Sequence, residues 1–400
     1  MTLRHVWKLT AVSCLVLVLS GCWSRHELNE LAIVVGIGID KEGEDYKVSV
    51  QVVNPGQVST RNGMSNILKP VVTYANTGQT VPEAIRKISL LSSKRLYFAH
   101  LRMVVFGETL ARQGINKSID YISRNPEMRN DFFIVVAKDS KPEEILSTFS
   151  SMDPIPANNM YMKLSNSDNL WAATGQLSLD RLLMDLMTTG KNPTMTAIQI
   201  AGDKEVGFRQ MNNNSIKPSA VLEYEGMAAF KGERMVGWLD EDQTKALNYL
   251  QDSVRQTLGV VQCPDGGYAS LDITHSKTTI KVGREGQLPV IDATVRLQQD
   301  ISDVECQLDM NKVETIDIFR KAGERKVIEL LEKGVEHAQK KLRSDIFGFG
   351  QEVHRQQPAM WHRIKDWNTV FPDVKVHIHS IVDMKKIGST AQPVQEEKRK

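Results

Sequence analysis

Apolar residues in the first part of the chain fall into short runs separated by polar turns. Residues 31–40 (LAIVVGIGID) are rich in Val and Ile, which is typical of a buried strand. Residues 46–52 alternate Tyr and Val with Lys, Ser and Gln, so they predict a strand with one face in water. The polar segment between the two runs predicts a turn, and we expect the two strands to form a hairpin.

Strands and helices continue to alternate through the next part of the chain. Thr80 and Glu83 are three positions apart, the spacing of a capping box, and a helix is predicted after them. Further strands are predicted at 102–107 and 132–137, and further helices at 108–123, after Pro142 and at 179–187. Strands that alternate with helices indicate an α/β or α+β layer. We therefore predict an N-terminal α/β domain over residues 22–208, with a more irregular part between 150 and 200.

The polar, Asn-rich residues 209–219 (RQMNNNSIKPS) predict a linker between two domains. A C-terminal α+β domain is predicted over 220–388, and the polar tail 389–400 is expected to be disordered. Its predicted elements are a hairpin at 226–239, a helix capped by Asp240, extended runs at 258–263, 268–282 and 289–303, a long helix at 313–346 and a strand at 374–382. The predicted fold class is α+β or mixed α/β in two to three domains, each a mixed or antiparallel sheet with packed helices.

The first 21 residues are organised as an export signal. A positively charged start (4–8) precedes an apolar run (9–19), and two small residues lie directly before Cys22. As a helix the apolar run would reach about 16 Å, well short of a bilayer core of ~30 Å. The residues LSGC resemble the lipobox of bacterial lipoproteins, which implies cleavage before Cys22 and an S-diacylglyceryl group on its sulfur. An uncleaved anchor helix and an ordinary signal with a chance cysteine are the alternatives.

The net charge of the mature chain argues against two kinds of partner. Residues 1–21 hold two of the 50 Lys and Arg residues and none of the 48 Asp and Glu residues, so 48 of each sign remain and the mature chain has a formal charge of zero. It therefore has no overall basic field to hold nucleic acid or anionic lipid headgroups. No second apolar stretch approaches the ~18 residues of a transmembrane helix, so the mature body is expected to be tethered to a membrane and not to span it.

Cys263 and Cys306 are the cysteines that remain when Cys14 leaves with the signal and Cys22 carries lipid. Two cysteines are too few for a disulfide scaffold, although an oxidising compartment would allow them to pair. We expect two separately buried thiols, with a disulfide as the alternative.

Catalytic and cofactor motifs are weak throughout the chain. The glycines of GIGID (36–40) lack the rest of a dinucleotide or P-loop motif, so they predict close packing of a strand, and FGFGQ (347–351) lacks the flanking pattern too. His377 and His379 share one face of a strand, but a zinc site needs further ligands, and we expect surface histidines. His100 is expected to be buried and hydrogen-bonded. We predict no catalytic, metal-ligating or cofactor-binding residue.

Six stretches of the chain resemble, in the same order, the Ger(x)C family of spore-germination lipoproteins. They are GCWSRHELNELAIVVGIGIDKE (21–42), KRLYFAHLRMVVFGETLARQGI (94–115), ISRNPEMRNDFFIVVAK (122–138), GMAAFKGERMVGWL (226–239), SDIFGFG (344–350) and MWHRIKDWNTVF (360–371). The resemblance implies a non-enzymatic C subunit of a nutrient-germinant receptor, working with an A subunit and a polytopic B subunit. It also implies a lipid anchor on Cys22, where an N-acyl chain such as palmitate can be added, at the outer face of the inner spore membrane. Whether this subunit contacts the germinant stays open.

Two other classes of function are compatible with a lipid anchor: a substrate-binding lipoprotein of a membrane transporter and a membrane-tethered hydrolase. Solute-capturing lipoproteins often have a long tether rich in Gly, Ser and Lys. Here the strand-like residues begin at Leu31, nine positions after Cys22, and this connection reaches at most about 30 Å. Such a short tether favours a subunit docked on a membrane partner, while the hydrolase has no motif in its support.

Overall fold

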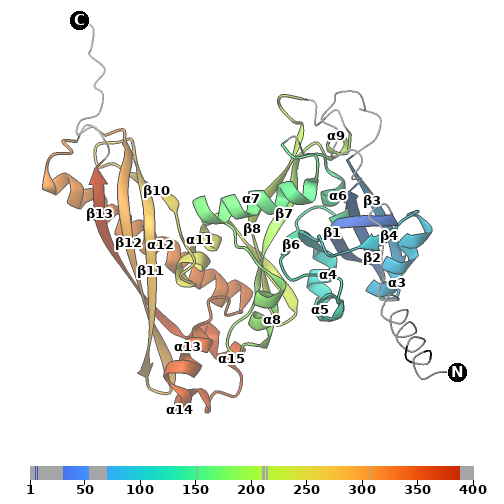
Figure 1. Ribbon diagram of the computed structural model, residues 1–400. Helices are drawn as coiled ribbons and strands as arrows, with labels where there is room; N and C mark the ends of the chain where they lie inside the picture. Colours follow the sequence, from blue (N-terminus) through green and yellow to red (C-terminus); the bar gives the residue numbers. More distant parts are fainter. Residues whose placement is uncertain are drawn as a thin grey trace, which may run out of the picture.

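Two β-sheets with packed helices lie one after the other along an elongated body (Figure 1). The computed structural model describes residues 5, 7, 30–53, 70–150, 152–209, 212, 215–306 and 308–387. The predicted lipid-carrying Cys22 and the tail 389–400 lie outside the described residues, as does nearly all of the predicted signal 1–21. Among the described helices, none is both long and apolar enough to cross a bilayer.

The first sheet is mixed and has nine strands among the described residues, in the order β3-β2-β1-β5-β6-β7-β8-β9, with β4 paired to β1. Its strands are β1 (Leu31–Glu42), β2 (Asp45–Val53), β3 (Val71–Gly78), β4 (Arg95–Tyr97), β5 (Met103–Gly107), β6 (Phe133–Ala137), β7 (Thr194–Gly202), β8 (Ala220–Lys231) and β9 (Arg234–Leu239). The central strands β1, β5, β6 and β7 run parallel, and the outer pairs are antiparallel.

Helices cover both faces of the first sheet. One face packs against α3 (Val81–Lys87), α4 (Glu108–Gln113), α5 (Asn116–Arg124) and α8 (Leu179–Met187), and the other against α6 (Pro142–Ser147) and α7 (Pro156–Leu170). The remaining short elements are η2 (Ile88–Leu90) and α9 (Lys204–Gly207). Burial on both sides explains why β1 is an almost continuous apolar run.

Most predicted elements of this half are confirmed. The hairpin of residues 31–52 is β1–β2, and Thr80 caps α3 by accepting a hydrogen bond from the Glu83 N–H, while the Glu83 carboxylate accepts from the Gln79 N–H. The helix predicted over 108–123 is instead two helices, because Gly114 has a φ of 131° and ends α4. Helix α7 lies in the part that was predicted to be irregular.

The predicted linker 209–219 falls between two neighbouring strands of the first sheet. It connects β7 to β8, which pair antiparallel from Gly202 and Ala220 onward, so both predicted domain ranges, 22–208 and 220–388, contribute strands to one sheet. The segment therefore joins two paired strands, and a division of the chain into independently folding domains at this point stays a prediction. The chain passes to the second sheet later, between α11 (Glu241–Leu250) and β10 (Thr257–Gln262).

The second sheet has four strands among the described residues, in the order β10-β11-β12-β13. The long strands β11 (Tyr268–Glu285), β12 (Leu288–Val304) and β13 (Lys375–Ile387) form its centre and one edge. Buried and exposed residues alternate along β11 and β12, because helices cover only one face of this sheet. The architecture confirms the predicted mixed α+β class, with helices packed on two sheets.

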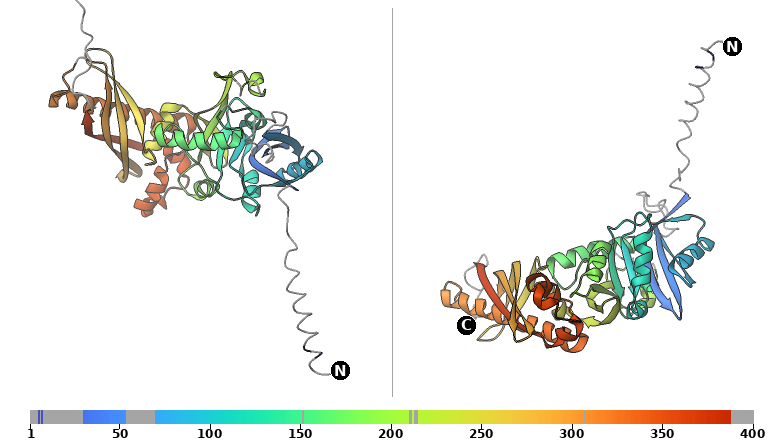
Figure 2. Two further views of the ribbon diagram at one scale, coloured as in Figure 1. Left: turned by 45° about the horizontal axis from the view of Figure 1, so that its top comes forward. Right: turned by 90° about the horizontal axis from the view of Figure 1, so that it is seen from below.

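Helix α12 (Val313–His337) lies along the covered face of the second sheet (Figure 2). The predicted long helix 313–346 ends at η3 (Ala338–Leu342), a π-helical turn, because Arg343 takes a left-handed backbone conformation. The chain then returns towards the first sheet through α13 (Phe349–Gln356), α14 (Pro358–Trp361), α15 (Trp367–Val370) and η4 (Phe371–Asp373).

Candidate functional site

Asp345 is the centre of a buried hydrogen-bond cluster at the junction of the two sheets. Its side chain is 0% exposed. One carboxylate oxygen accepts hydrogen bonds from the N–H groups of Phe347, Gly348 and Phe349, at 2.9–3.2 Å. The other accepts from the Gly350 N–H at 2.7 Å and from the Trp367 indole N–H at 2.8 Å. All five partners are donors, so the geometry suits the charged carboxylate.

The same segment is hydrogen-bonded to the first sheet. The Ser344 hydroxyl donates to the Phe230 carbonyl of β8 at 2.6 Å, and the Asn192 N–H donates to the Asp345 carbonyl at 2.8 Å. Asn192 also accepts from the Gly232 N–H at the turn between β8 and β9. Three stretches that carry the family resemblance, 226–239, 344–350 and 360–371, therefore meet at one place in the fold.

Glycine permits this close approach of backbones. Gly190, in the loop before β7, has a φ of 82°, and a Cβ there would lie 2.5 Å from the Gly350 carbonyl carbon. The Gln351 N–H donates to the Gly190 carbonyl at 3.1 Å. A larger residue at either glycine would force the two sheets apart.

Three clefts, of about 350, 340 and 320 Å³, surround a charged cluster beside this junction. Lys191 and Asp185 form an ion pair at 2.7 Å, with side chains only 8% and 12% exposed, and Arg181 lies 3.4 Å from the same carboxylate. Each of these three residues lines two of the clefts. The clefts are polar and could hold a small polar molecule, but Lys191, Asp185 and Arg181 are already paired with one another.

Burial raises the pKa of two aspartates at or near the junction. Burial raises the pKa of Asp345 to about 6, against the opposing effect of its N–H donors. Asp168, which lines the largest of the three clefts, also has a raised pKa because of burial. Neither Asp345 oxygen is free to attack or to take a proton from a ligand in a cleft, so this carboxylate organises the backbone around it.

The residues singled out in the sequence are not brought together. His377 and His379 are exposed on β13, as expected, and His377 lies 3.1 Å from Asp292. His100 was expected to be buried, and this is wrong: it is exposed in the turn after β4, with its ring edge-on to Tyr97. The chain turns at Phe98 and Leu101, so the side chain between them points outward.

The glycines of GIGID serve close packing, as predicted. A Cβ on Gly38 would lie 2.6 Å from the Pro142 Cβ, and one on Gly36 would lie 2.7 Å from the Leu146 Cδ2, both in α6. Asp345 was missed. Its signal in the sequence is an aspartate directly before a segment with two glycines, the composition of a turn in which a carboxylate accepts from successive N–H groups.

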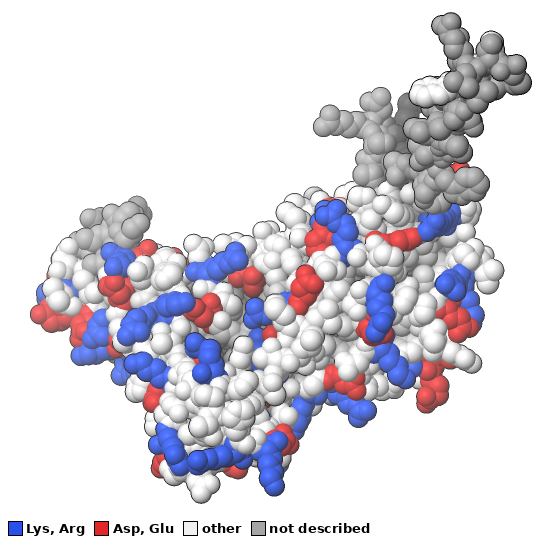
Figure 3. Space-filling view, turned by 60° about the horizontal axis from the view of Figure 1, so that its bottom comes forward, with Lys and Arg blue, Asp and Glu red and all other residues white. Residues whose placement is uncertain are grey.

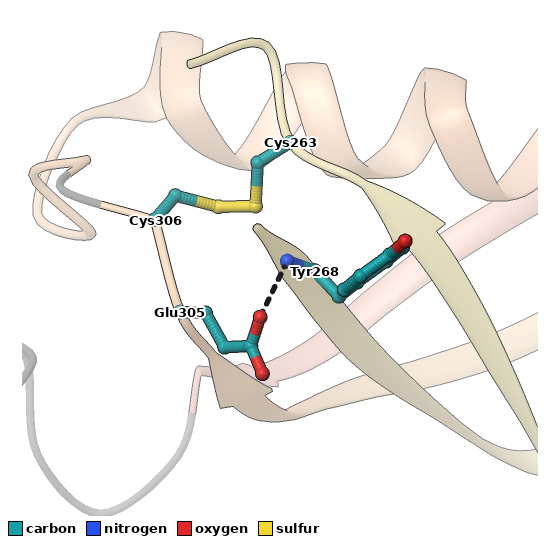
Figure 4. Close-up of a disulfide and its surroundings, with 4 residues drawn as sticks. All are labelled: Cys263, Tyr268, Glu305 and Cys306. Carbon is teal, nitrogen blue, oxygen red and sulfur yellow. Dashed lines mark hydrogen bonds between the residues drawn. A yellow bond between two sulfur atoms is a disulfide. The ribbon is translucent and has the colours of Figure 1, made fainter. Parts of the chain in front are cut away.

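Cys263 and Cys306 form a disulfide at the far end of the second sheet (Figure 4). Our expectation of two free thiols is therefore wrong. In the order β10-β11-β12, strands β10 and β12 run in the same direction, so the residues after their ends meet beyond the start of β11, with Cα atoms 6.1 Å apart. There the Glu305 carboxylate accepts a hydrogen bond from the Tyr268 N–H at 2.9 Å. Asp265 lies near both sulfurs, but a disulfide sulfur is no thiolate ligand for a metal.

The fold and the junction define a two-sheet α+β protein whose parts are joined by buried hydrogen bonds. Residues 24–200 match the family described as "Spore germination protein N-terminal domain", and residues 225–388 match "Spore germination B3/GerAC like, C-terminal". The chain belongs to the Ger(x)C family of spore-germination proteins.

Known relatives cover nearly the whole chain. It is 28% identical to spore germination protein KC of Bacillus subtilis (strain 168), over 95% of each chain. It is 22% identical to spore germination protein B3 of the same strain, over 92% of this chain and 94% of that one. A crystal structure of the GerBC protein has the same fold, with a TM-score of 0.54 at 16% identity over 87% of this chain and 96% of that one. These relatives support a role in spore germination.

Proposed function

We propose that this protein is a lipid-anchored, non-enzymatic subunit of a nutrient-germinant receptor, which assembles or signals with membrane-embedded A and B subunits. The observation that carries the proposal is the match to spore germination proteins over nearly the whole chain. The anchor is Cys22, held at the outer face of the inner spore membrane. The role of the body is to position its partners, and it performs no chemistry of its own.

Two structural features support this proposal. A disulfide between Cys263 and Cys306 is typical of a protein on an oxidising side of a membrane. The buried contacts around Asp345 hold the two sheets in one arrangement, which suits a body that passes a positional change from one partner to another.

Two experiments test the proposal. Deletion of the gene should abolish germination in response to one class of nutrient, while growth, sporulation and responses to unrelated germinants continue. Cys22→Ala should remove lipid labelling and weaken membrane retention, with a smaller germination defect than the deletion, because partner contacts still hold the body. Normal germination of the deletion strain towards every nutrient, or acyl label that persists on the Cys22→Ala protein, would contradict the proposal.

A substrate-binding lipoprotein is the second candidate, and the clefts beside Lys191 favour it. Calorimetric titration of the full chain with amino acids, sugars and nucleosides separates the two. Weak or no binding fits the receptor subunit, whose ligand pocket would lie in the polytopic partner. Tight, saturable binding that Asp185→Ala removes would assign the protein to the solute-binding class.

A further inference from the structure

A groove of about 710 Å³ lies at the end of the first sheet that is distant from the second sheet. It is formed by α3 and η2, by β4 and the turn that follows it, and by the end of α5. We call it the terminal groove, and its lining includes Ile85, Arg86, Lys94, Arg95, Phe98 and Arg124. Its floor is apolar, with Ile85 and Phe98 buried in the sheet's core. Its rim carries four cationic side chains.

Two adjacent leucines project beside the terminal groove. Leu90, the last residue of η2, is 81% exposed and Leu91, which follows it, is 52% exposed, although the first residue of η2, Ile88, is fully buried. Ser89 and Ser92, on either side of the pair, line the groove itself. An apolar pair next to an apolar groove with a charged rim is the composition of a surface that is covered in the working protein.

Cations outnumber anions at this rim. Arg95 pairs with Glu127 and Arg124 with Asp120, but Arg86 and Lys94 form no ion pair with a carboxylate of the described residues. Over the whole chain basic and acidic residues are nearly equal in number, and on the face drawn in Figure 3 their side chains are interspersed. The mature chain has no overall excess of basic residues, but at this rim cations outnumber anions, which is complementary to an anionic surface.

Strand register fixes where this end lies relative to the anchor. Leu31, the first residue of β1, is paired in parallel with Arg95 on the rim of the terminal groove. Cys22 precedes Leu31 by nine positions, so a lipid on Cys22 would hold Leu31 within about 30 Å of the bilayer. Leu90 and Leu91 reach this end because α3 returns from the far end of β3 towards β4.

We propose that the terminal groove and the Leu90–Leu91 pair dock on an anionic lipid bilayer, with the leucines in the interface and the cations on lipid phosphates. This inference rests on the proposed membrane anchoring. The diacylglyceryl group proposed on Cys22 has two acyl chains and anchors the protein stably, and a second contact made of apolar and basic residues adds affinity at the surface of the body. Docking would also fix the orientation of the body, so that the two sheets extend away from the lipid.

The test uses the full chain in vesicles of phosphatidylglycerol and phosphatidylethanolamine. A dansylalanine is incorporated at Leu90 in one sample and at Val313, in the second sheet's domain, in another. Val313 is a matched control because it is an apolar residue of similar exposure, 75%. The emission at position 90 should shift to shorter wavelength and be quenched by brominated lipid, while position 313 should do neither. Equal emission from the two positions overturns the proposal.

Reversing the charge of rim residues, together with changes of salt and lipid, tests whether the terminal groove binds lipid or a protein. One basic residue near an anionic surface is worth about five-fold in affinity, so Arg86→Glu with Lys94→Glu should weaken docking at least about 25-fold and abolish the shift. High salt or phosphatidylcholine vesicles should have the same effect in the unaltered chain. A shift that occurs only when a polytopic partner is reconstituted with the chain would replace the lipid by a protein and overturn the proposal.

Failure of this inference can be told from failure of the proposed function. If position 90 stays in water while deletion of the gene still blocks germination, the docking surface is wrong and the receptor role stands. If position 90 enters the lipid but the deletion strain germinates normally, the surface stands and the receptor role is wrong.

Discussion

The two sheets of this protein differ in how many of their faces are covered by helices. Helices bury both faces of the first sheet, while the second sheet keeps one face in water. The central strands of the first sheet are accordingly almost continuous apolar runs, and β11 and β12 alternate. Apolar layers on both sides hold the first sheet, whereas the second depends on α12, a disulfide and the Asp345 junction. The comparison teaches that the second sheet is the part most sensitive to single polar contacts.

Removal of the Asp345 carboxylate should have the largest effect. Asp345→Ala leaves five N–H donors buried without an acceptor, which predicts a loss of about 3–5 kcal/mol in the free energy of unfolding. The second sheet should then unfold before the first, giving two transitions in calorimetry where the unaltered chain gives one. The control is Asp303→Ala, which removes an exposed side chain of β12 and should change the free energy of unfolding by less than about 0.5 kcal/mol. A single transition at an unchanged temperature would show that the junction does not couple the sheets.

Reduction of the disulfide should come next. Cys263 and Cys306 are 43 positions apart, and a loop of this size is worth roughly 4 kcal/mol in the chain-entropy model. Because both cysteines lie in the second sheet, hydrogen exchange after reduction should speed up in β10 to β12 and stay unchanged in β1 and β5. Mass spectrometry of the unreduced protein must show the 263–306 crosslink, and its absence would disprove the pairing.

The free energy of unfolding should also depend on pH, through Asp345 in the second half of the molecule. The pKa of Asp345 is about 6 in the folded chain, against about 4 for an unfolded aspartate. Between these values the folded chain holds a proton that the unfolded chain has released, so the free energy of unfolding falls as the pH rises from about 4 to about 6 and is level above that. The expected change is roughly 3 kcal/mol, measured as the difference between the unaltered chain and Asp345→Asn in urea. A difference that does not vary with pH would contradict the assignment.

The stability of the first sheet should depend mainly on close apolar packing between the sheet and its helices. Gly38→Ala places a Cβ against Pro142 of α6, which predicts a loss of about 1–3 kcal/mol in the free energy of unfolding. The control is Gly259→Ala, where the added Cβ would make only an ordinary contact at 3.6 Å. Gly43→Ala is unsuitable as a control because Gly43 has a positive φ. Similar denaturant midpoints for the two variants would indicate that α6 can move away from β1.

The smallest effect is expected on the open face of the second sheet. His379→Ala removes an exposed side chain, so its free energy of unfolding should stay within about 0.5 kcal/mol of the unaltered chain. A loss larger than about 2 kcal/mol would mean that this face is covered, and the contrast between the two sheets would no longer hold.

Local sequence determined most of the elements and much of the fold class. Runs of apolar residues gave β1 and β5, alternation gave β11 and β12, and Asp240 and Ser178 cap α11 and α8 through hydrogen bonds within one turn. These signals act over a few residues, so they can be read without knowing what the element packs against. The absence of the rest of a nucleotide-binding motif likewise predicted that the GIGID glycines serve packing.

Only the tertiary structure decided which elements share a sheet and which side chains meet. The polar segment 209–219 looks the same whether it links two domains or two neighbouring strands, because pairing of β7 with β8 is a property of partners distant from it. The pairing of Cys263 with Cys306 depends on the order of three strands, and the role of Asp345 depends on a tryptophan 22 positions away. Such contacts form between residues far apart in the chain, and no local pattern encodes the geometry that brings them together.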